Sequence, residues 1–490
     1  MQSARAGVLT YWAAALLAAG AGGFVATRPY APRALLALAA VIAVAALLER
    51  CGVGCAIGLL ILGCLDALPG PNLETLQVAA TIKGQDVVVA VLVLLLAFEN
   101  ARERFYSLRH TRWGAALACW SLVFLAWWAF TAARTWLSTD VPLLHAAFWA
   151  RDFAYFAILL PLLFAVLRRR SVRRTVLITV AVGAVVAGLA QSAVVVAHSH
   201  LTFIVHTYMA GEVNGLTRLY TSASDIPFAA LPLGLGLLLF GGTLRRRLIG
   251  AVLAAISLVA VLIGLTRAIY VGEVAGLGLA TALWLARPDA VGRVGRRQLI
   301  AIGLVGAVAA GMLVAYTPAT LGTNAINGVS SRVVSLETDL SGTSPVDASL
   351  EDRNLDYARL EQLLGGHWLI GLGFLDPSFD YVPGLPQGSI RNSDVGVFNT
   401  LETMGLIGTG IYALPLLALL VALARHRLRA RRRSDEDWLA YGALAWAIAA
   451  LATSATLTVF FNPAEVVGAA TMLALAAVVV SSTRSGELSA

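Results

Sequence analysis

Three isolated arginines are the strongest candidates for binding a charged ligand. Arg218 occurs in Gly-Leu-Thr-Arg-Leu-Tyr, Arg267 occurs in Leu-Thr-Arg-Ala-Ile-Tyr, and Arg353 lies in a long polar stretch. A guanidinium group stays charged and presents a fork of N–H donors that matches phosphate oxygens. Together the three would suit the phosphate or pyrophosphate head of a lipid-linked substrate. For each one alone, contact with lipid headgroups or snorkelling from a helix end is the alternative.

Acidic side chains supply the candidates for proton transfer. Asp394 precedes a long apolar run, where a carboxylate can cap a helix or act as a general base toward a hydroxyl. Arg151 and Asp152 lie within another apolar run, where ionisable groups face a cavity or form an ion pair with neighbouring helices. Glu273 follows Arg267 by about two helical turns and allows the same two interpretations. His367 is expected to be a surface or packing residue.

The elements that must hold these residues are membrane helices. Hydrophobic residues make up 59% of the 490-residue chain, and charged residues make up only 13%, which is too few to cover the surface of a soluble protein. A membrane-spanning helix needs about 20 mostly apolar residues. We therefore predict an all-α, polytopic transmembrane helical bundle with about 12–14 spans. The candidate ranges are 8–27, 33–49, 52–68, 85–99, 113–132, 143–167, 175–197, 226–243, 248–265, 268–286, 298–317, 396–423, 438–459 and 464–482.

Clusters of arginine predict how the bundle is oriented. The clusters lie two predicted spans apart, so all of them fall on one side of the membrane, and the positive-inside rule makes that side cytoplasmic. Because the net charge of +8 comes from these loop clusters, it does not indicate nucleic-acid binding. The clusters are Arg102–Arg112, Arg168–Arg174, Arg245–Arg247, Arg293–Arg297 and Arg425–Arg433. The loops expected on the outer side are 69–84, 198–225, the turn near Arg267 and 318–395.

The outer segment 318–395 is long enough to form a separate element. It divides the chain into an N-terminal bundle part, 1–317, an extracytoplasmic loop domain, 318–395, and a C-terminal bundle part, 396–490. A helix is predicted inside the loop, with Ser349 as its cap and an apolar face that includes Leu355 and Leu363. Gly365 should end this helix. A loop of this length inside a compact bundle is usually functional.

With these features in order, the chain resembles the O-antigen ligase and O-antigen (exopolysaccharide) polymerase superfamily of bacterial integral membrane glycosyltransferases. The resemblance covers roughly residues 200–425 and depends on the order of four features around the long outer loop. These are Arg218 followed by Asp225-Ile-Pro-Phe; Thr266-Arg267 at the start of a span; Arg353 followed by His367-Trp-Leu-Ile-Gly-Leu-Gly-Phe; and Asp394 ahead of Glu402-Thr-Met-Gly-Leu-Ile-Gly.

The resemblance implies a specific reaction. Such proteins move a glycan from an undecaprenyl-diphosphate (polyprenyl-diphosphate) carrier to a hydroxyl of an acceptor glycan or glycolipid, outside the bacterial inner membrane. They use no nucleotide sugar, cofactor or metal. Arg218, Arg267 and Arg353 would hold the diphosphate, with Arg151 as a fourth candidate. Arg267 and Arg353 would also stabilise the charge that develops as the diphosphate leaves.

One departure from the family pattern concerns the base. Ligases of this family usually carry a His-Asn pattern near the start of the span after the loop, whereas this chain has Ser393-Asp394 there. The role of base therefore passes to Asp394 by position, and the difference favours a polysaccharide polymerase over a ligase.

Two other functions compete with this interpretation. One is a lipid-linked glycan flippase or secondary transporter, for which we find no internal repeat, and the other is a membrane scaffold without enzymatic activity.

Overall fold

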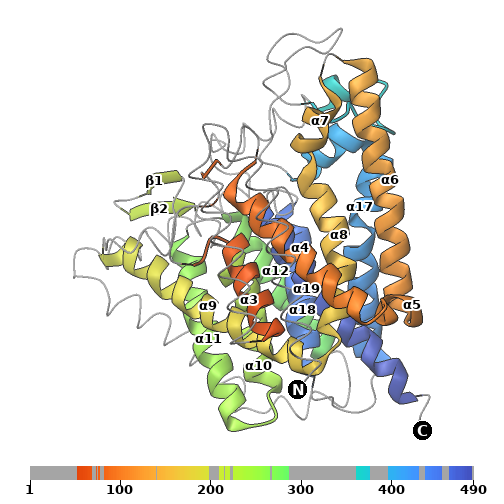
Figure 1. The fold of residues 1–490 in the computed structure, drawn as a ribbon. Coiled ribbons are helices and arrows are strands. Elements are labelled where there is room, and N and C mark those ends of the chain that lie inside the picture. The colour runs from red at the N-terminus through yellow and green to blue at the C-terminus, as the bar shows by residue number, and fades with distance from the viewer. Residues whose placement is uncertain are drawn as a thin grey trace, which may run out of the picture.

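The computed structural model describes most of the membrane bundle. It covers residues 52–68, 73, 76–77, 82–139, 141–197, 209–213, 216–220, 225–264, 267–285, 360–375, 396–429, 436–454 and 463–487. The predicted all-α bundle is confirmed (Figure 1). Its helices are α3 (Val53–Cys64), α4 (Gly84–Arg102), α5 (Tyr106–His110), α6 (Arg112–Ser138), α7 (Leu143–Trp149), α8 (Arg151–Leu167), α9 (Arg170–Ala197), α10 (Asp225–Phe240), α11 (Leu244–Ile263), α12 (Arg267–Leu285), α17 (Gly396–Arg429), α18 (Asp437–Ser454) and α19 (Pro463–Glu487).

The length and composition of these helices make the chain a multi-pass membrane protein. Six described helices are long and apolar enough to cross a membrane, and α7 with α8 would make a seventh. Shorter apolar helices occupy Val53–Cys64, Asp225–Phe240 and Ala268–Trp284. Every predicted span that falls within the described residues coincides with a helix or with the α7–α8 pair. The ranges 8–27, 33–49 and 298–317 lie outside those residues, so the total of 12–14 spans stays a prediction.

Three segments differ from the expected pattern. The predicted single span 143–167 is two helices that meet at an angle of 59° around Ala150. The span predicted at 396–423 continues to Arg429 and is interrupted at Gly405. The outer loop 198–225 contains a short antiparallel hairpin of β1 (Met209–Val213) and β2 (Leu216–Tyr220), in which Arg218 pairs with Gly211. Hydropathy alone does not reveal the two helix breaks, because the residues on both sides of each break are mostly apolar.

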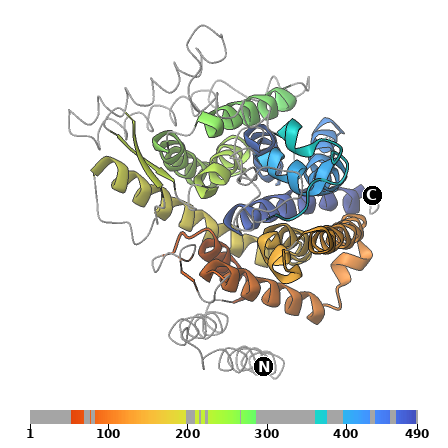
Figure 2. The same ribbon diagram turned by 90° about the horizontal axis from the view of Figure 1, so that it is seen from above.

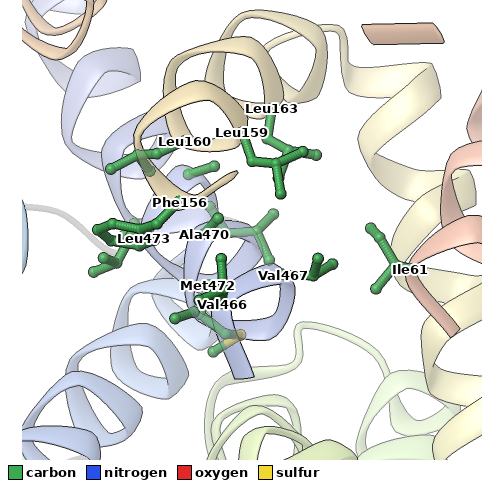
Figure 3. Packing of buried hydrophobic residues seen from close by; sticks show 14 of the residues in the cluster. Ile61, Phe156, Leu159, Leu160, Leu163, Val466, Val467, Ala470, Met472 and Leu473 are labelled. Atoms are coloured by element: carbon green, nitrogen blue, oxygen red, sulfur yellow. The ribbon is translucent and has the colours of Figure 1, made fainter. Parts of the chain in front are cut away.

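Helix α19 forms the centre of the bundle. Within its 18-residue apolar stretch, 83% of the residues are buried, compared with 33% for α6, which faces outward. Figure 3 shows Leu159, Leu160 and Leu163 of α8 packed against α19, with Ile61 of α3 alongside. Seen from above, the remaining helices surround this centre (Figure 2). The core therefore consists of helices from both predicted parts of the chain, before and after the long loop.

Close backbone approach fixes the pairing of α12 with α18. A Cβ atom added to Gly276 would lie 2.3 Å from the carbonyl oxygen of Ala445. One turn earlier, a Cβ on Gly272 would lie 2.1 Å from the hydroxyl oxygen of Thr453. Membrane helices associate mainly through such packing because lipid removes most of the hydrophobic driving force between them. The Gly272–Gly276 pair thus holds α12, which begins at Arg267, tightly against the bundle.

The helix ends that carry arginine clusters within the described residues lie together. In Figure 1 this end includes α5 and the connection between α10 and α11. The contacts that join it are Arg169 with Glu99 at 2.8 Å and with Glu103 at 3.3 Å, Arg173 with Glu436, and Arg427 with the carbonyl oxygen of Trp284 at 2.9 Å. The structure thus has one basic end, and the opposite end carries the starts of α4, α8, α12 and α17.

Candidate functional site

The end of the bundle opposite the arginine clusters contains the candidate site. Helix α7, the start of α17 and the segment 360–375 gather there at the upper end of Figure 1. Two interrupted helices meet at this end, one at Ala150 and one at Gly405. Interrupted helices leave backbone donors and acceptors unpaired, so other groups must satisfy them inside a membrane. The contacts that do so define the geometry of the site.

Arg151 secures the first break by an ion pair. Its Nε donates to Oδ1 of Asp86 on α4 at 2.6 Å, and its Nη1 donates to the carbonyl oxygen of Phe148 at 2.7 Å. The hydroxyl of Tyr155 donates to the same Asp86 oxygen at 3.3 Å, and the backbone N–H of Lys83 donates to Oδ2 at 2.7 Å. The ion-pair interpretation of Arg151 is therefore confirmed. Its binding of a diphosphate stays a prediction, and two of its donors are already engaged.

Asp152 differs from its neighbour Arg151. Its Oδ1 atom is buried and accepts no hydrogen bond from any residue that the structure describes. The next residue, Phe153, packs edge-on against Tyr412 of α17, with ring centroids 5.2 Å apart. Asp152 therefore offers an unfilled acceptor near the junction of α8 with α17. Buried acceptors of this kind are rare in proteins and call for an explanation.

The second break is held by a backbone clasp, which we define as residues 368–374 bonded to residues 402–407. Four hydrogen bonds make the clasp. They are Leu372 N to Glu402 O at 2.6 Å, Gly373 N to Thr403 O at 3.0 Å, Leu406 N to Trp368 O at 2.8 Å, and Ile407 N to Leu369 O at 3.2 Å. In addition, Phe374 N donates to the hydroxyl of Thr135 on α6 at 2.8 Å. The clasp replaces helical hydrogen bonds that α17 loses at Gly405.

Glycine makes the clasp possible. Gly405 has φ 65° and ψ −173°, a conformation that is essentially restricted to glycine. A Cβ atom on Gly405 would lie 2.4 Å from both the backbone nitrogen of Gly371 and the carbonyl oxygen of Leu369. Gly371 also has a positive φ, of 68°. The glycines in His367-Trp-Leu-Ile-Gly-Leu-Gly-Phe and Glu402-Thr-Met-Gly-Leu-Ile-Gly thus allow these two segments to meet.

A small apolar cluster extends the clasp outward. Leu360 and Leu364 pack with Phe398 in the first turn of α17, and Leu372 and Leu401 join them. Residues 360–364 are helical, and the helix ends at Gly365, which has φ 43°, as the sequence predicts. Residues 360–372 of the long loop are thereby fixed to the start of α17, the helix that Asp394 precedes.

The predicted site residues are described to different extents. Arg267 is the first residue of α12, and Arg218 lies on β2, but only the backbone of each is described. Arg353 and Asp394 lie outside the described residues, as does most of the loop domain 318–395. Whether the arginines converge on one ligand stays a prediction.

Glu273 is buried, and neither of its carboxylate oxygens has a partner among the described residues.

The sequence analysis did not identify two hydrogen-bond donors on α6 that the structure shows to be buried without a described acceptor. Arg134 is half-buried, and its Nη2 atom is buried without an acceptor among the residues described. The indole N–H of Trp127 is likewise buried without a described partner. Arg134 lies beyond the predicted end of its span at residue 132, so it resembled an ordinary flanking residue. Its isolation from every arginine cluster was the signal that could have identified it.

No protein-family model matches the chain, and a search of curated proteins finds no similar sequence.

Proposed function

We propose that this membrane protein is a glycosyltransferase of the O-antigen ligase or polysaccharide polymerase type. It would transfer a glycan from an undecaprenyl-diphosphate carrier to a hydroxyl of an acceptor glycan or glycolipid on the extracytoplasmic face. The observation that carries this proposal is the clasp. Two of the four segments on which the family resemblance depends, His367–Phe374 and Glu402–Gly408, are hydrogen-bonded to each other at the non-basic end of the bundle.

The location suits a donor with a charged head and an apolar tail. The basic end of the bundle would face the cytoplasm by the positive-inside rule. The clasp end would then meet the outer leaflet, where a lipid-linked diphosphate presents its glycan. Arg267 begins α12 at this end, and Leu360 and Leu364 hold there the helical residues 360–364, which come after Arg353 in the sequence.

The reaction assigns one role to each group. The acceptor hydroxyl oxygen attacks the anomeric carbon of the donor, and Asp394 takes the hydroxyl proton. The bond between that carbon and the diphosphate oxygen breaks, and the polyprenyl diphosphate leaves with the bonding electrons. Arg267 and Arg353 stabilise the negative charge on the leaving diphosphate, and Arg218 helps to hold it.

The test is a transfer assay with the purified protein and a diphosphate-linked glycan in lipid nanodiscs. Arg267→Ala and Arg353→Ala should each abolish transfer. Arg245→Ala is the matched control, because Arg245 is exposed at the basic end, and it should keep full activity. If both site variants transfer glycan at the rate of the control, the site assignment is wrong. Asp394→Asn tests the base separately, and normal turnover would leave Asp394 as a helix cap.

One observation favours the transport alternative. Broken helices hold the substrate in many transporters, and two helical segments of this bundle are broken, at Ala150 and at Gly405. Reconstituted vesicles distinguish the two functions. Movement of a labelled lipid-linked glycan between leaflets, without formation of a longer glycan or glycolipid, would favour a flippase. Glycan transfer without movement would favour the enzyme.

A further inference from the structure

We propose that the outer part of the seam between α6 and α17 binds an anionic phospholipid of the bilayer. Its phosphate would contact Arg134, and its acyl chains would lie over exposed apolar residues of the clasp and both helices. The proposal uses Arg134 and exposed apolar residues that have no role in the proposed transfer reaction, so it does not depend on the proposed function.

Arg134 is a cation without a counter-charge in the described chain. The ion pairs among the described residues involve Arg102, Arg151, Arg169 and Arg173, and no described carboxylate lies within ion-pair distance of Arg134. A partly buried charge in a membrane protein is costly unless an opposite charge compensates it. Arg134 is half-buried, and its Nη2 atom has no acceptor among the described residues, so its charge indicates an anionic ligand on the accessible side of the side chain.

The position of Arg134 along α6 matches the level of lipid headgroups. The distance from Arg112 to Arg134 corresponds to about 33 Å of helix, compared with a hydrocarbon core of about 30 Å. Arg112 is exposed at the basic end of the bundle, so Arg134 lies near the opposite headgroup layer. A Cβ atom on Gly373 of the clasp would be 3.7 Å from Nη2 of Arg134, which places the clasp at the same level.

An apolar surface runs below Arg134 toward the membrane centre. Phe130 lies one turn away on the same face of α6, is 49% exposed, and packs against Trp127 with ring centroids 5.4 Å apart. Trp127 in turn contacts α17, because a Cβ on Gly408 would lie 2.4 Å from its indole nitrogen. Next to this contact, Leu406 is 50% exposed.

The clasp continues the same surface. Leu369 is 62% exposed and accepts a hydrogen bond from Ile407, which is itself 42% exposed. Exposed apolar side chains of this size at the border of the headgroup layer are stabilised by contact with lipid hydrocarbon. A cation above an apolar strip matches the two parts of a phospholipid, a phosphate and its acyl chains.

The location on the bundle favours a bulk phospholipid over the lipid-linked donor. Helix α6 lies on the opposite side of the bundle from the β1–β2 hairpin that carries Arg218, in both views (Figures 1 and 2). Only a third of the residues in the 18-residue apolar stretch of α6 are buried, so bilayer lipids reach its surface directly. An anionic phospholipid present throughout the membrane would occupy such a site by mass action.

The test is native mass spectrometry of the full-length protein with phosphatidylglycerol and, in parallel, phosphatidylcholine. We expect the wild-type protein to retain phosphatidylglycerol selectively, and Arg134→Gln to bind it about ten- to a hundredfold more weakly, the loss expected for one charge-assisted contact. Arg112→Ala, at the basic end of the same helix, should bind like the wild type. Arg134→Lys keeps the charge and should keep the preference for phosphatidylglycerol, which provides a second test if Arg134→Gln folds poorly.

Three results would overturn the proposal. The first is equal retention of the two phospholipids by the wild-type protein. The second is unchanged phosphatidylglycerol binding by Arg134→Gln. The third is displacement of the Arg134-dependent lipid by an equal concentration of undecaprenyl diphosphate, because the site would then belong to the donor. None of these measurements uses glycan transfer, so a failure here is distinguishable from a failure of the proposed function.

Discussion

Replacing Gly405 by alanine should open the clasp. The added Cβ atom would lie 2.4 to 2.5 Å from backbone atoms of Leu369, Ile370 and Gly371. Backbone atoms cannot move aside as a flexible side chain can, so either α17 or the segment 368–374 must shift. The positive φ of 65° adds strain for any residue with a Cβ atom.

The expected cost follows from the four hydrogen bonds of the clasp. Each backbone hydrogen bond contributes about 0.5–1.5 kcal/mol net, so losing all four costs about 2–6 kcal/mol. The strain at Gly405 alone would cost about 1–3 kcal/mol, and the steric overlap adds to it. Release of the clasp removes both the strain and the overlap, and α17 can then remake helical hydrogen bonds across residue 405, so we expect the clasp to open and the rest of the bundle to stay intact. A loss of about 2 kcal/mol corresponds to about a thirtyfold change in the opening equilibrium.

Amide hydrogen exchange measures this opening directly. The donors in the clasp are the N–H groups of Leu372, Gly373, Leu406 and Ile407. In Gly405→Ala, peptides that contain them should exchange at least about thirtyfold faster, while peptides of α19 should be unchanged. Gly410→Ala is the matched control on the same helix, because a Cβ at Gly410 meets no atom within 4 Å.

The reasoning would be refuted by equal exchange in Gly405→Ala and Gly410→Ala. Equal protection would mean that the clasp tolerates a Cβ atom at its point of closest approach. Faster exchange throughout the bundle would also contradict it, because the clasp would then be coupled to the whole fold.

Three further predictions concern thermal unfolding in detergent, with tryptophan fluorescence as the signal that reports unfolding. Gly276→Ala should lower the free energy of unfolding by about 1–3 kcal/mol, because the added Cβ atom overpacks against α18. Gly278→Ala is the control, because a Cβ atom there meets no atom within 4 Å and should not lower stability. Equal melting temperatures of the two variants would contradict this prediction. Arg169→Ala should lower the free energy of unfolding by about 1–3 kcal/mol, because the fully buried Glu99 loses its closer ion-pair partner and keeps Arg102 at 3.8 Å. Adding Glu99→Gln should recover most of the loss, and no recovery would mean that packing dominates. Glu273→Gln should keep or raise stability, since neither carboxylate oxygen has a described partner, and a clear loss would reveal a partner in the remaining chain.

The sequence predicted the helices well because each one contains a long apolar run. The spans at 85–99, 113–132 and 175–197 match α4, α6 and α9, with α6 extending six residues further than expected. The arginine clusters also predicted correctly which helix ends lie together, as the Arg169–Glu99 pair shows. Both signals are local in sequence and follow from the thickness and polarity of a membrane.

The breaks and pairings were not predictable in the same way. The break at Ala150 depends on Asp86, which lies far away in sequence and receives Arg151 through a tertiary contact. The break at Gly405 depends on the approach of Gly371, and a glycine in an apolar run reads equally well as a packing residue. The unpaired state of Arg134 is also a tertiary property, because no acid on the described neighbouring helices, α8 and α17, lies within ion-pair distance of it.

The central position of α19 has a consequence for how the protein is made. Helix α19 follows all the other described helices in sequence, yet it packs against α3, α4, α8, α17 and α18. During synthesis the earlier helices enter the membrane before their common neighbour exists, so lipid or loosely packed side chains must fill its place. Assembly therefore finishes at the middle of the bundle, and final packing around Phe156 and Leu160 must wait for Val466 and Leu473 to arrive.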